Sequence, residues 1–363
     1  MPEDLIDDIY EAGVISERWP ALLQRITDLV EAHGTILFVA RQAALKFFAS
    51  PEIEPLIPHY FDRGYQFRDE RTKRLFDYNH AGFVQDLDVF TPEEWDADPI
   101  RREMWSPNGL GWGVATHLPM PTGESIIIHA ERAAVRGPVE RPFIEALDRL
   151  RPHLARATLM SSRLAFERAS GAVQALGMLG LPAAVLDQAG RLVVANGGFE
   201  ALVPVLFLDR QTGIELVEPA AQLLFRQGFE AVAAATPGAA PLSLPMPARN
   251  GHPPMIVHMM PVRGAAQDVF SRASVVLFVT PVVVADVPSA EVIQGLFDLT
   301  PAEARVARAL GRGESVAEIA ERSAVAQPTV RNQIREIFAK TGVHRQAHLV
   351  GLLRGIVMPA EDK

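Results

Sequence analysis

The clearest hydrophobic pattern in the chain runs through residues 299–354, where apolar side chains recur every three or four positions between short polar turns. Thr300 and Glu303 have the spacing of a capping box, in which two residues satisfy each other's backbone N–H groups at a helix start. Ser315 and Glu318 repeat this spacing. Two helix starts are therefore predicted in this part of the chain from local chemistry alone.

A third predicted helix, at about 327–340, differs from the others in its exposed face. Its inner positions are apolar, whereas its outer positions carry Arg331, Asn332, Arg335 and Lys340. An arginine can donate two hydrogen bonds to guanine, and an asparagine can pair with adenine, when their helix lies in the major groove. With a last helix at 345–354, the pattern indicates an all-α, four-helix DNA-binding domain of the helix-turn-helix type.

The residues that carry this pattern also match a known family in order and spacing. The matching positions are Leu299-Thr300-Pro301, Glu303, Gly313, Glu318-Ile319-Ala320, Thr329-Val330-Arg331-Asn332 and Lys340-Thr341-Gly342-Val343. This stretch resembles the LuxR-type (NarL/FixJ-class) helix-turn-helix. The resemblance implies base contacts from Arg331, Asn332 and Arg335, phosphate contacts near Thr329 and Lys340, and a dimer contact through the last helix.

Three positions depart from the family pattern. The usual small capping residue before the third helix is Ala326, the usual leucine two turns earlier is Ser323, and the common histidine is Gln333. Losing a cap costs on the order of 1 kcal/mol, and Pro328 can offset part of this by fixing the backbone. These departures affect the expected stability of the helix more than its expected contacts with DNA.

The distribution of charge favours DNA binding at this end of the chain. Residues 300–354 contain nine Lys or Arg and five Asp or Glu, a balance of +4, whereas the whole chain of 363 residues carries −9. An acidic body with one basic domain confines attraction for DNA phosphates to that domain. Double-stranded DNA is therefore the expected partner of residues 298–357.

Residues 1–151 alternate between helical and strand patterns and are predicted to form an α+β sensor domain. The patterns predict helices at 5–32, at 55–78 and from 139 onward, and strands at 35–40, 46–49, 111–118 and 124–131. The last two strands, joined by residues 119–123, are predicted to pair as a hairpin. This order suits one antiparallel sheet with helices packed on it. The arrangement is similar to GAF-like and autoinducer-domain-like sensor folds, although a fold by itself assigns no ligand.

Aromatic residues are concentrated in this first domain, since all four tryptophans and all four tyrosines precede residue 113. We expect a pocket for a small molecule, lined by Tyr60, Tyr65, Trp95, Trp105 and Trp112, with Asp69 or His117 as a polar anchor. The alternative is that these aromatics are ordinary core and surface residues of a domain without a ligand.

The run from Tyr60 to Asp69 resembles the aromatic segment of the LuxR-family receptors for acyl-homoserine lactones. The Trp and Tyr that these receptors carry upstream are replaced here by Leu56 and Glu52, and Asp69 is followed by Glu70 rather than by proline. A lactone is therefore the less favoured ligand. The identity of the ligand, and of any cofactor, is left open.

The middle of the chain is predicted to contain a connecting helix at 152–178 and a second α+β domain at 179–281. Pro152 is expected to kink the helix or to begin a new one. Residues 181–196 contain an apolar strand, an Asp-x-x-Gly turn, a second strand and Asn196 placed to cap a helix. This order resembles the opening of a PAS domain, a family whose members hold haem, flavin or metabolites, or only dimerise.

Two further strands are predicted in this PAS-like domain, at 255–263 and 273–280, joined by a loop at 264–270. His258 alternates with apolar neighbours in the first of them and is interpreted as a structural residue rather than a haem ligand. Residues 282–297 are predicted to be a linker to the DNA-binding domain, short enough to transmit a change in dimer geometry.

Composition excludes several other kinds of chemistry. The chain has no cysteine, which excludes disulfides, thiolate metal sites and cysteinyl–flavin adducts. It has neither a basic-then-apolar leader nor a run of about eighteen apolar residues, so we expect a cytoplasmic protein without a membrane partner. No catalytic or metal-binding motif appears, and no enzyme is expected, although His117, His129 and Glu131 could share a sheet face.

A phosphorylated receiver domain is also excluded, because Asp7 and Asp8 lie in a predicted helix rather than after a strand. The remaining prediction is a homodimeric transcription regulator, with RNA polymerase as a further partner. Its sensor domains would bind a small molecule and alter the placement of the helix-turn-helix units. The alternative is a constitutive DNA-binding regulator whose PAS-like domain only dimerises or binds a protein.

Overall fold

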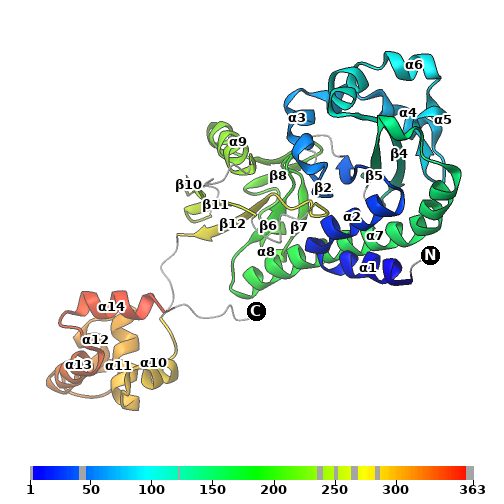
Figure 1. Ribbon diagram of the computed structural model, residues 1–363. Helices are drawn as coiled ribbons and strands as arrows, with labels where there is room; N and C mark the ends of the chain where they lie inside the picture. Colours follow the sequence, from blue (N-terminus) through cyan, green and yellow to red (C-terminus); the bar gives the residue numbers. More distant parts are fainter. Residues whose placement is uncertain are drawn as a thin grey trace.

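The computed structural model describes residues 3–40, 46–121, 123–234, 240–248, 252–262, 269–282 and 287–356. Figure 1 shows an N-terminal unit and a central unit, each built on a sheet, and a helical C-terminal unit. One long helix, α7 (Arg141–Met178), belongs to both of the first two units. The protein is thus of mixed α+β type with antiparallel sheets and a helical C-terminal region.

The N-terminal unit is organised around a five-stranded antiparallel sheet in the order β2-β1-β5-β4-β3. Its strands are β1 (Gly34–Ala40), β2 (Lys46–Ala49), β3 (Val84–Gln85), β4 (Leu110–Pro119) and β5 (Ser125–Ala133). Its other elements are α1 (Glu3–Val14), η1 (Ser16–Arg18), α2 (Trp19–Leu29), η2 (Glu54–Leu56), α3 (Ile57–Asp62), η3 (Tyr65–Phe67), α4 (Glu70–Tyr78), α5 (Asp86–Val89), α6 (Pro92–Ala97), η4 (Arg101–Trp105), η5 (Ser106–Asn108) and η6 (Ala134–Arg136).

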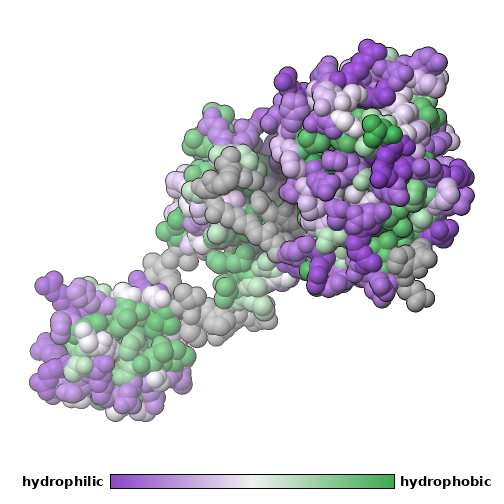
Figure 2. All heavy atoms as spheres, viewed as in Figure 1, coloured by the Kyte–Doolittle hydropathy of each residue, from purple (hydrophilic) through white to green (hydrophobic). Residues whose placement is uncertain are grey.

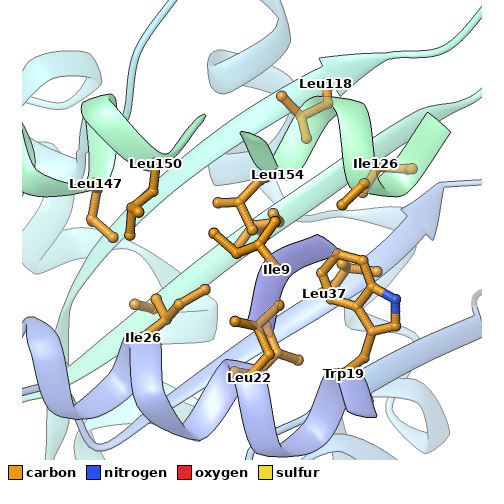
Figure 3. Packing of buried hydrophobic residues seen from close by; sticks show 14 of the residues in the cluster. Ile9, Trp19, Leu22, Ile26, Leu37, Leu118, Ile126, Leu147, Leu150 and Leu154 are labelled. Atoms are coloured by element: carbon orange, nitrogen blue, oxygen red, sulfur yellow. The ribbon is translucent and has the colours of Figure 1, made fainter. Parts of the chain in front are cut away.

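Strand alternation decides what lies on each face of this sheet. Leu37 and Val39 of β1, with Ile126 and Ile128 of β5, pack against α1, α2 and α7 in the main core, part of which Figure 3 shows. The residues between them point to the opposite face, which α3 and α4 cover. The two faces therefore have separate roles, a dense core on one side and a candidate site on the other.

The predicted helix at 5–32 is wrong in its continuity. The chain forms α1, then the short η1, then α2, because Ile15 between them has extended backbone angles (φ −114°, ψ 94°) and Pro20 begins a new helical turn. The helical stretch predicted at 55–78 is likewise divided into η2, α3, η3 and α4, with Gly64 in the left-handed region at φ 66°. The predicted pairing of residues 111–118 with 124–131 is confirmed as β4 and β5.

The connecting helix predicted at 152–178 is the second half of α7, which spans 38 residues and continues through Pro152. No new helix begins at this proline. Residues Ile144 to Ala157 of α7 pack in the N-terminal core, while Val173 packs against the central sheet. One helix therefore contributes to two cores.

The central unit contains a five-stranded sheet in the order β10-β11-β12-β6-β7 and a separate hairpin of β8 and β9. Its elements are β6 (Ala183–Leu186), β7 (Leu192–Ala195), α8 (Gly197–Glu200), β8 (Phe207–Arg210), β9 (Gly213–Leu216), α9 (Pro219–Ala233), β10 (Leu242–Met246), β11 (Met255–Pro261) and β12 (Val275–Pro281). As predicted, Asn196 caps α8, accepting from the Phe199 amide at 3.0 Å. Most of the predicted loop at 264–270 lies outside the described residues.

The C-terminal unit consists of α10 (Ala290–Phe297), α11 (Pro301–Gly311), α12 (Val316–Arg322), α13 (Gln327–Thr341) and α14 (Gln346–Arg354). Both predicted capping boxes, Thr300 with Glu303 and Ser315 with Glu318, are confirmed. The prediction of a plain linker at 282–297 is wrong where it overlaps α10, whose Ile293 is buried in the core of this unit. Residues 283–286 of that range lie outside the described residues.

Candidate functional site

The first candidate site is the exposed face of α13. Its buried residues Val330 and Ile337 pack with α11, α12 and α14 in one apolar core and fix the helix in place. Arg331, Asn332 and Arg335 are exposed on its outer surface, as predicted. The side chain of Arg335 is 75% exposed, and Glu336, which lies 3.8 Å from it, is also exposed. This face therefore presents donors and acceptors without burying them in the protein itself.

The ends of α13 differ in their chemistry. Thr329 is exposed in the first turn, and the N-terminal cap, Ala326, has extended angles but no side chain that can accept a hydrogen bond. At the other end Lys340 donates to Glu303 at 2.8 Å and ties α13 to the start of α11. This pair lowers the pKa of Glu303 and raises the pKa of Lys340. A phosphate contact by Lys340 would compete with this ion pair.

The second candidate site is a cavity of about 370 Å³ in the N-terminal unit, on the face of the sheet opposite the main core. Strand alternation supplies its floor: Ile36 and Phe38 from β1, Gly113 and Ala115 from β4, and Ile127 and His129 from β5. Its walls come from β2, α3, α4 and the segments near them, and they are Phe47, Ile57, Tyr60, Phe61, Gln66, Phe67, Asp69, Arg71, Thr72, Leu75, Phe76, Val84, Gln85, Asp86, Val89 and Trp105. The lining is mainly apolar and aromatic with a polar end, as small-molecule sites usually are.

Arg71 is the centre of the polar end. Its guanidinium donates to both oxygens of Asp86, at 3.0 and 3.1 Å, and to Glu131 at 3.0 Å. His129 lies 2.7 Å from the same oxygen of Glu131, and Asp86 also accepts from the Gly113 amide. The guanidinium carbon lies 4.7 Å from the centre of the Trp95 ring and 5.7 Å from that of Trp105.

The electrostatics of this network follow from its burial. Burial alone would lower the pKa of Arg71, but Asp86 and Glu131 outweigh it and raise that pKa, so the guanidinium stays charged. Burial, opposed by Arg71, raises the pKa of Asp86 to about 6. For Glu131 burial also acts upward, but Arg71 and His129 lower the pKa overall. The charge of Arg71 is thus already compensated within the protein.

Asp69 organises the opposite wall. Its carboxylate caps α4 by accepting from the Arg71 amide at 2.9 Å, and it accepts from the hydroxyls of Tyr60 at 2.7 Å and Thr72 at 3.2 Å. Burial and the neighbouring Asp69 raise the pKa of Tyr60, so this hydroxyl remains protonated. Asp69 is therefore a structural anchor of the wall as well as part of the lining.

The structure brings together three of the seven predicted ligand residues on the cavity lining: Tyr60, Asp69 and Trp105. Tyr65 packs behind Tyr60, with ring centres 5.9 Å apart, and its hydroxyl donates to Glu103 at 3.0 Å. Trp95 lies behind Arg71 and donates to the Gly111 carbonyl at 3.1 Å. The prediction is corrected for these two residues, whose polar atoms are used within the fold.

Trp112 and His117 are also absent from the cavity lining. Trp112 donates to the Ala134 carbonyl at 3.1 Å, beyond the bulge in the pairing of β4 with β5. His117 lies on the same face of β4 as the cavity, and its ring packs edge-on against that of Phe76, with ring centres 5.3 Å apart. Phe76 lines the cavity and His117 does not. Burial and then Arg151 lower the pKa of His117. The alternation along β4 predicts the face on which His117 lies, but it does not predict that Phe76 lies against that ring.

The residues that sequence reasoning missed are Arg71, Asp86 and Gly113. The available signal was weak, because Arg71 and Asp86 occur in polar, charged surroundings that resemble a solvated surface. A stronger hint was that His129 and Glu131 point to one face of a largely apolar strand, because a buried carboxylate requires a partner.

Three polar atoms of the lining have no hydrogen-bond partner within the described residues. They are the indole Nε1 of Trp105, which is only 4% exposed, and the amide oxygens of Gln66 and Gln85. An unsatisfied buried donor costs roughly 1–3 kcal/mol, so its retention calls for an explanation. A bound molecule with an acceptor for Trp105 would satisfy it.

Two kinds of feature are absent from the described part of the chain. No group of three or more His, Cys, Asp or Glu residues could hold a metal ion. No described helix has both the length and the apolar character needed to span a bilayer.

Comparison with known proteins gave structural likenesses only. No family model matches the sequence, and no curated protein matches it. The ligand-binding domain of VqsR from Pseudomonas aeruginosa is 15% identical, covers 44% of this chain and 94% of its own, and superposes with a TM-score of 0.37. SdiA from Escherichia coli is 13% identical over 94% of this chain and 92% of its own, with a TM-score of 0.30.

The Vibrio cholerae VqmA dimer, a LuxR-type receptor, is 20% identical over 49% of this chain and 84% of its own, with a TM-score of 0.23. The structural neighbours are thus ligand-binding domains and full-length regulators of the LuxR type. TM-scores this low do not carry a functional assignment, which depends on the geometry of the two sites.

Proposed function

We propose that this protein is a sequence-specific DNA-binding transcription regulator, acting as a homodimer and controlled by a small molecule in the cavity of the N-terminal unit. The observation that carries the proposal is the exposed face of α13. Arg331, Asn332 and Arg335 lie on a helix held from behind by Val330 and Ile337. Side chains of these types, so presented, can enter a major groove and pair with base edges.

A dimer follows from the size of the reading surface. One helix of this kind contacts only a few base pairs, and specific regulators reach useful discrimination by reading two half-sites with two-fold symmetry. We therefore expect an inverted-repeat operator.

The cavity favours regulation by a ligand rather than constitutive DNA binding. A sensor domain without a ligand would be packed throughout, whereas this one holds about 370 Å³ of space beside an unpaired indole N–H. Because the charge of Arg71 is compensated by Asp86 and Glu131, a negatively charged head group would meet excess carboxylate. The ligand is proposed to be an uncharged molecule with an apolar body and an acceptor that faces Trp105.

The test of DNA recognition begins with selection of a binding site from random duplex DNA by the full chain. Arg331→Ala and Arg335→Ala are then compared with wild type on the selected site and on scrambled DNA. Each lost base contact should weaken specific binding by about 1–3 kcal/mol and leave binding to scrambled DNA much less affected. Arg226→Ala, at an exposed arginine of α9 in the central unit, is the charge-matched control.

If the two α13 variants bound the selected site as wild type does, α13 would not be the reading helix. If no sequence were enriched from the random pool at low salt, sequence-specific DNA binding itself would be excluded.

A further inference from the structure

Residues 269–273 of the central unit, here called the docking segment, lie partly inside the N-terminal unit. Val269 and Phe270 are 6% and 2% exposed and belong to the same apolar core as α1, α2 and α7. The Phe270 ring lies 5.3 Å from that of Trp19, one of the residues labelled in Figure 3. The central unit is therefore fastened to the N-terminal core by side chains, in addition to the shared helix α7.

Polar contacts secure the same segment on both sides. The Lys46 ammonium donates to the Ser271 carbonyl at 3.1 Å, which joins the docking segment to strand β2. Arg272 lies 3.3 Å from Glu124 of the N-terminal unit and 3.3 Å from Asp187 in the β6–β7 turn of the central unit. A single guanidinium thus bridges carboxylates of the two units.

Strand β2 connects the docking segment to the cavity. Phe47 lines the cavity, where its ring lies 5.7 Å from that of Phe61. Phe48, the next residue, points to the opposite face and its ring lies 6.1 Å from that of Phe270. Because β2 is an edge strand, held by β1 alone within the sheet, its position can respond to what fills the cavity.

The docking segment leads directly toward the DNA-binding unit. Ala273 is buried in the central core, and β12 begins at Val275. The strand ends at Pro281, a few residues before Val287, which packs in the core of the C-terminal unit. Phe270 and the C-terminal unit are therefore joined by one strand and a short connection.

We propose that β2 and the docking segment form the coupling element through which the contents of the cavity act on β12 and so on the DNA-binding unit. This proposal rests on the proposed function for its biological purpose, but the mechanical claim stands on Phe47, Phe48, Phe270 and Arg272 alone. A larger molecule in the cavity displaces Phe47, and Phe48 moves with it because the two residues are adjacent in β2. The movement of Phe48 changes the packing of Phe270, and β12, which follows Phe270 in the chain, shifts as a result. The rival route is α7, which also spans both units.

Hydrogen exchange of the full chain tests the coupling without DNA or ligand. Ala115→Phe places a ring in the cavity from β4, and Phe47→Leu is a second perturbation, on β2 itself. Both should change amide exchange in β12 several-fold, as well as in β4 and β5. In the background of Phe270→Ala, or of the milder Arg272→Ala, the change in β12 should vanish while the changes in β4 and β5 remain.

Arg163→Ala on α7, whose partner Glu167 is exposed, is the matched control and should leave the effect on β12 intact. An effect on β12 that persists in both docking variants would overturn the proposal in favour of α7. The proposal would also be overturned if the cavity variants, made in the otherwise wild-type chain, changed amide exchange in β4 and β5 but not in β12. Neither result depends on DNA binding or on any ligand, so failure of the coupling and failure of the proposed function are distinguishable.

Discussion

Gly113 lies directly against the guanidinium of Arg71, since a β-carbon at position 113 would come within 1.9 Å of Arg71 Nη2 and within 2.7 Å of the His129 ring. Arginine side chains usually move aside, but this one is held by Asp86 and Glu131. The glycine therefore preserves the space that the buried network occupies.

Gly113→Ala should accordingly destabilise the N-terminal unit by about 1–3 kcal/mol, the usual cost of overpacking. Urea unfolding followed by tryptophan fluorescence reports mainly on this unit, because every tryptophan of the chain lies in it. The control is Gly171→Ala in α7, where a β-carbon meets nothing within 4 Å. That change should be neutral or slightly stabilising, and equal effects at the two positions would contradict the steric account.

Replacing Arg71 by Met should have a larger effect than filling the space beside it. Asp86 and Glu131 are 7% and 0% exposed, and removing their partner leaves buried carboxylates uncompensated. Breaking a buried pair in this way costs about 3–5 kcal/mol. The same fluorescence-detected unfolding gives the free energy. Arg74→Met removes an arginine that is 32% exposed and pairs with Glu94, and it should cost much less. A loss below that of the Arg74 variant would mean that the network is not a stabilising unit.

Trp105→Phe should weaken ligand binding while changing stability little, because its indole N–H makes no hydrogen bond within the described protein. A suitable probe is octanoylglycerol, which joins an apolar tail to an uncharged head that accepts hydrogen bonds. Loss of one neutral hydrogen bond corresponds to roughly 1 kcal/mol, or about fivefold in affinity, measurable by calorimetry. Trp112→Phe, outside the cavity, should bind the probe as wild type does. Equal affinity of the two variants would remove Trp105 from the site.

Acid should loosen the C-terminal unit through Glu303. Because Lys340 and the Thr300 amide lower the pKa of this carboxyl, its contribution to stability is present above its ordinary pKa of 4.5 and is lost as pH falls through the lowered value. Glu303→Gln keeps the hydrogen-bond acceptor but cannot titrate, so amide exchange in α11 and α13 should accelerate less on acidification than in wild type. Glu230→Gln in α9 should leave this pH dependence unchanged. An identical acid response in wild type and Glu303→Gln would refute the assignment.

Ala326→Ser should stabilise α13. Position 326 already has the extended angles of a helix cap (φ −72°, ψ 145°) but lacks a side-chain acceptor. A hydroxyl there can accept from the first turn and should add about 1 kcal/mol, seen as slower amide exchange in α13. Ala339→Ser, at an exposed position inside the same helix, should give no gain. Equal exchange in the two variants would show that the missing cap has no cost here.

Features that depend on neighbours a few residues apart could be predicted from the sequence alone. The capping boxes at Thr300 and Ser315 and the cap at Asn196 are local hydrogen bonds, and the residues needed for each lie within one helical turn. Alternation along β4 and β5 likewise predicted two paired strands.

The way in which distant residues combine depends on the three-dimensional fold and could not be predicted from the sequence. Arg71 and Asp86 come from the starts of α4 and α5, and Gly113 and Glu131 come from β4 and β5. They meet because of the register of β4 with β5 and the packing of α4 across the sheet. The same holds for Phe270, because no local sequence pattern predicts that it is buried in the N-terminal core. Local hydrogen bonds depend on spacing along the chain. The buried network and the contacts of the docking segment depend instead on which surfaces pack against each other in the complete fold.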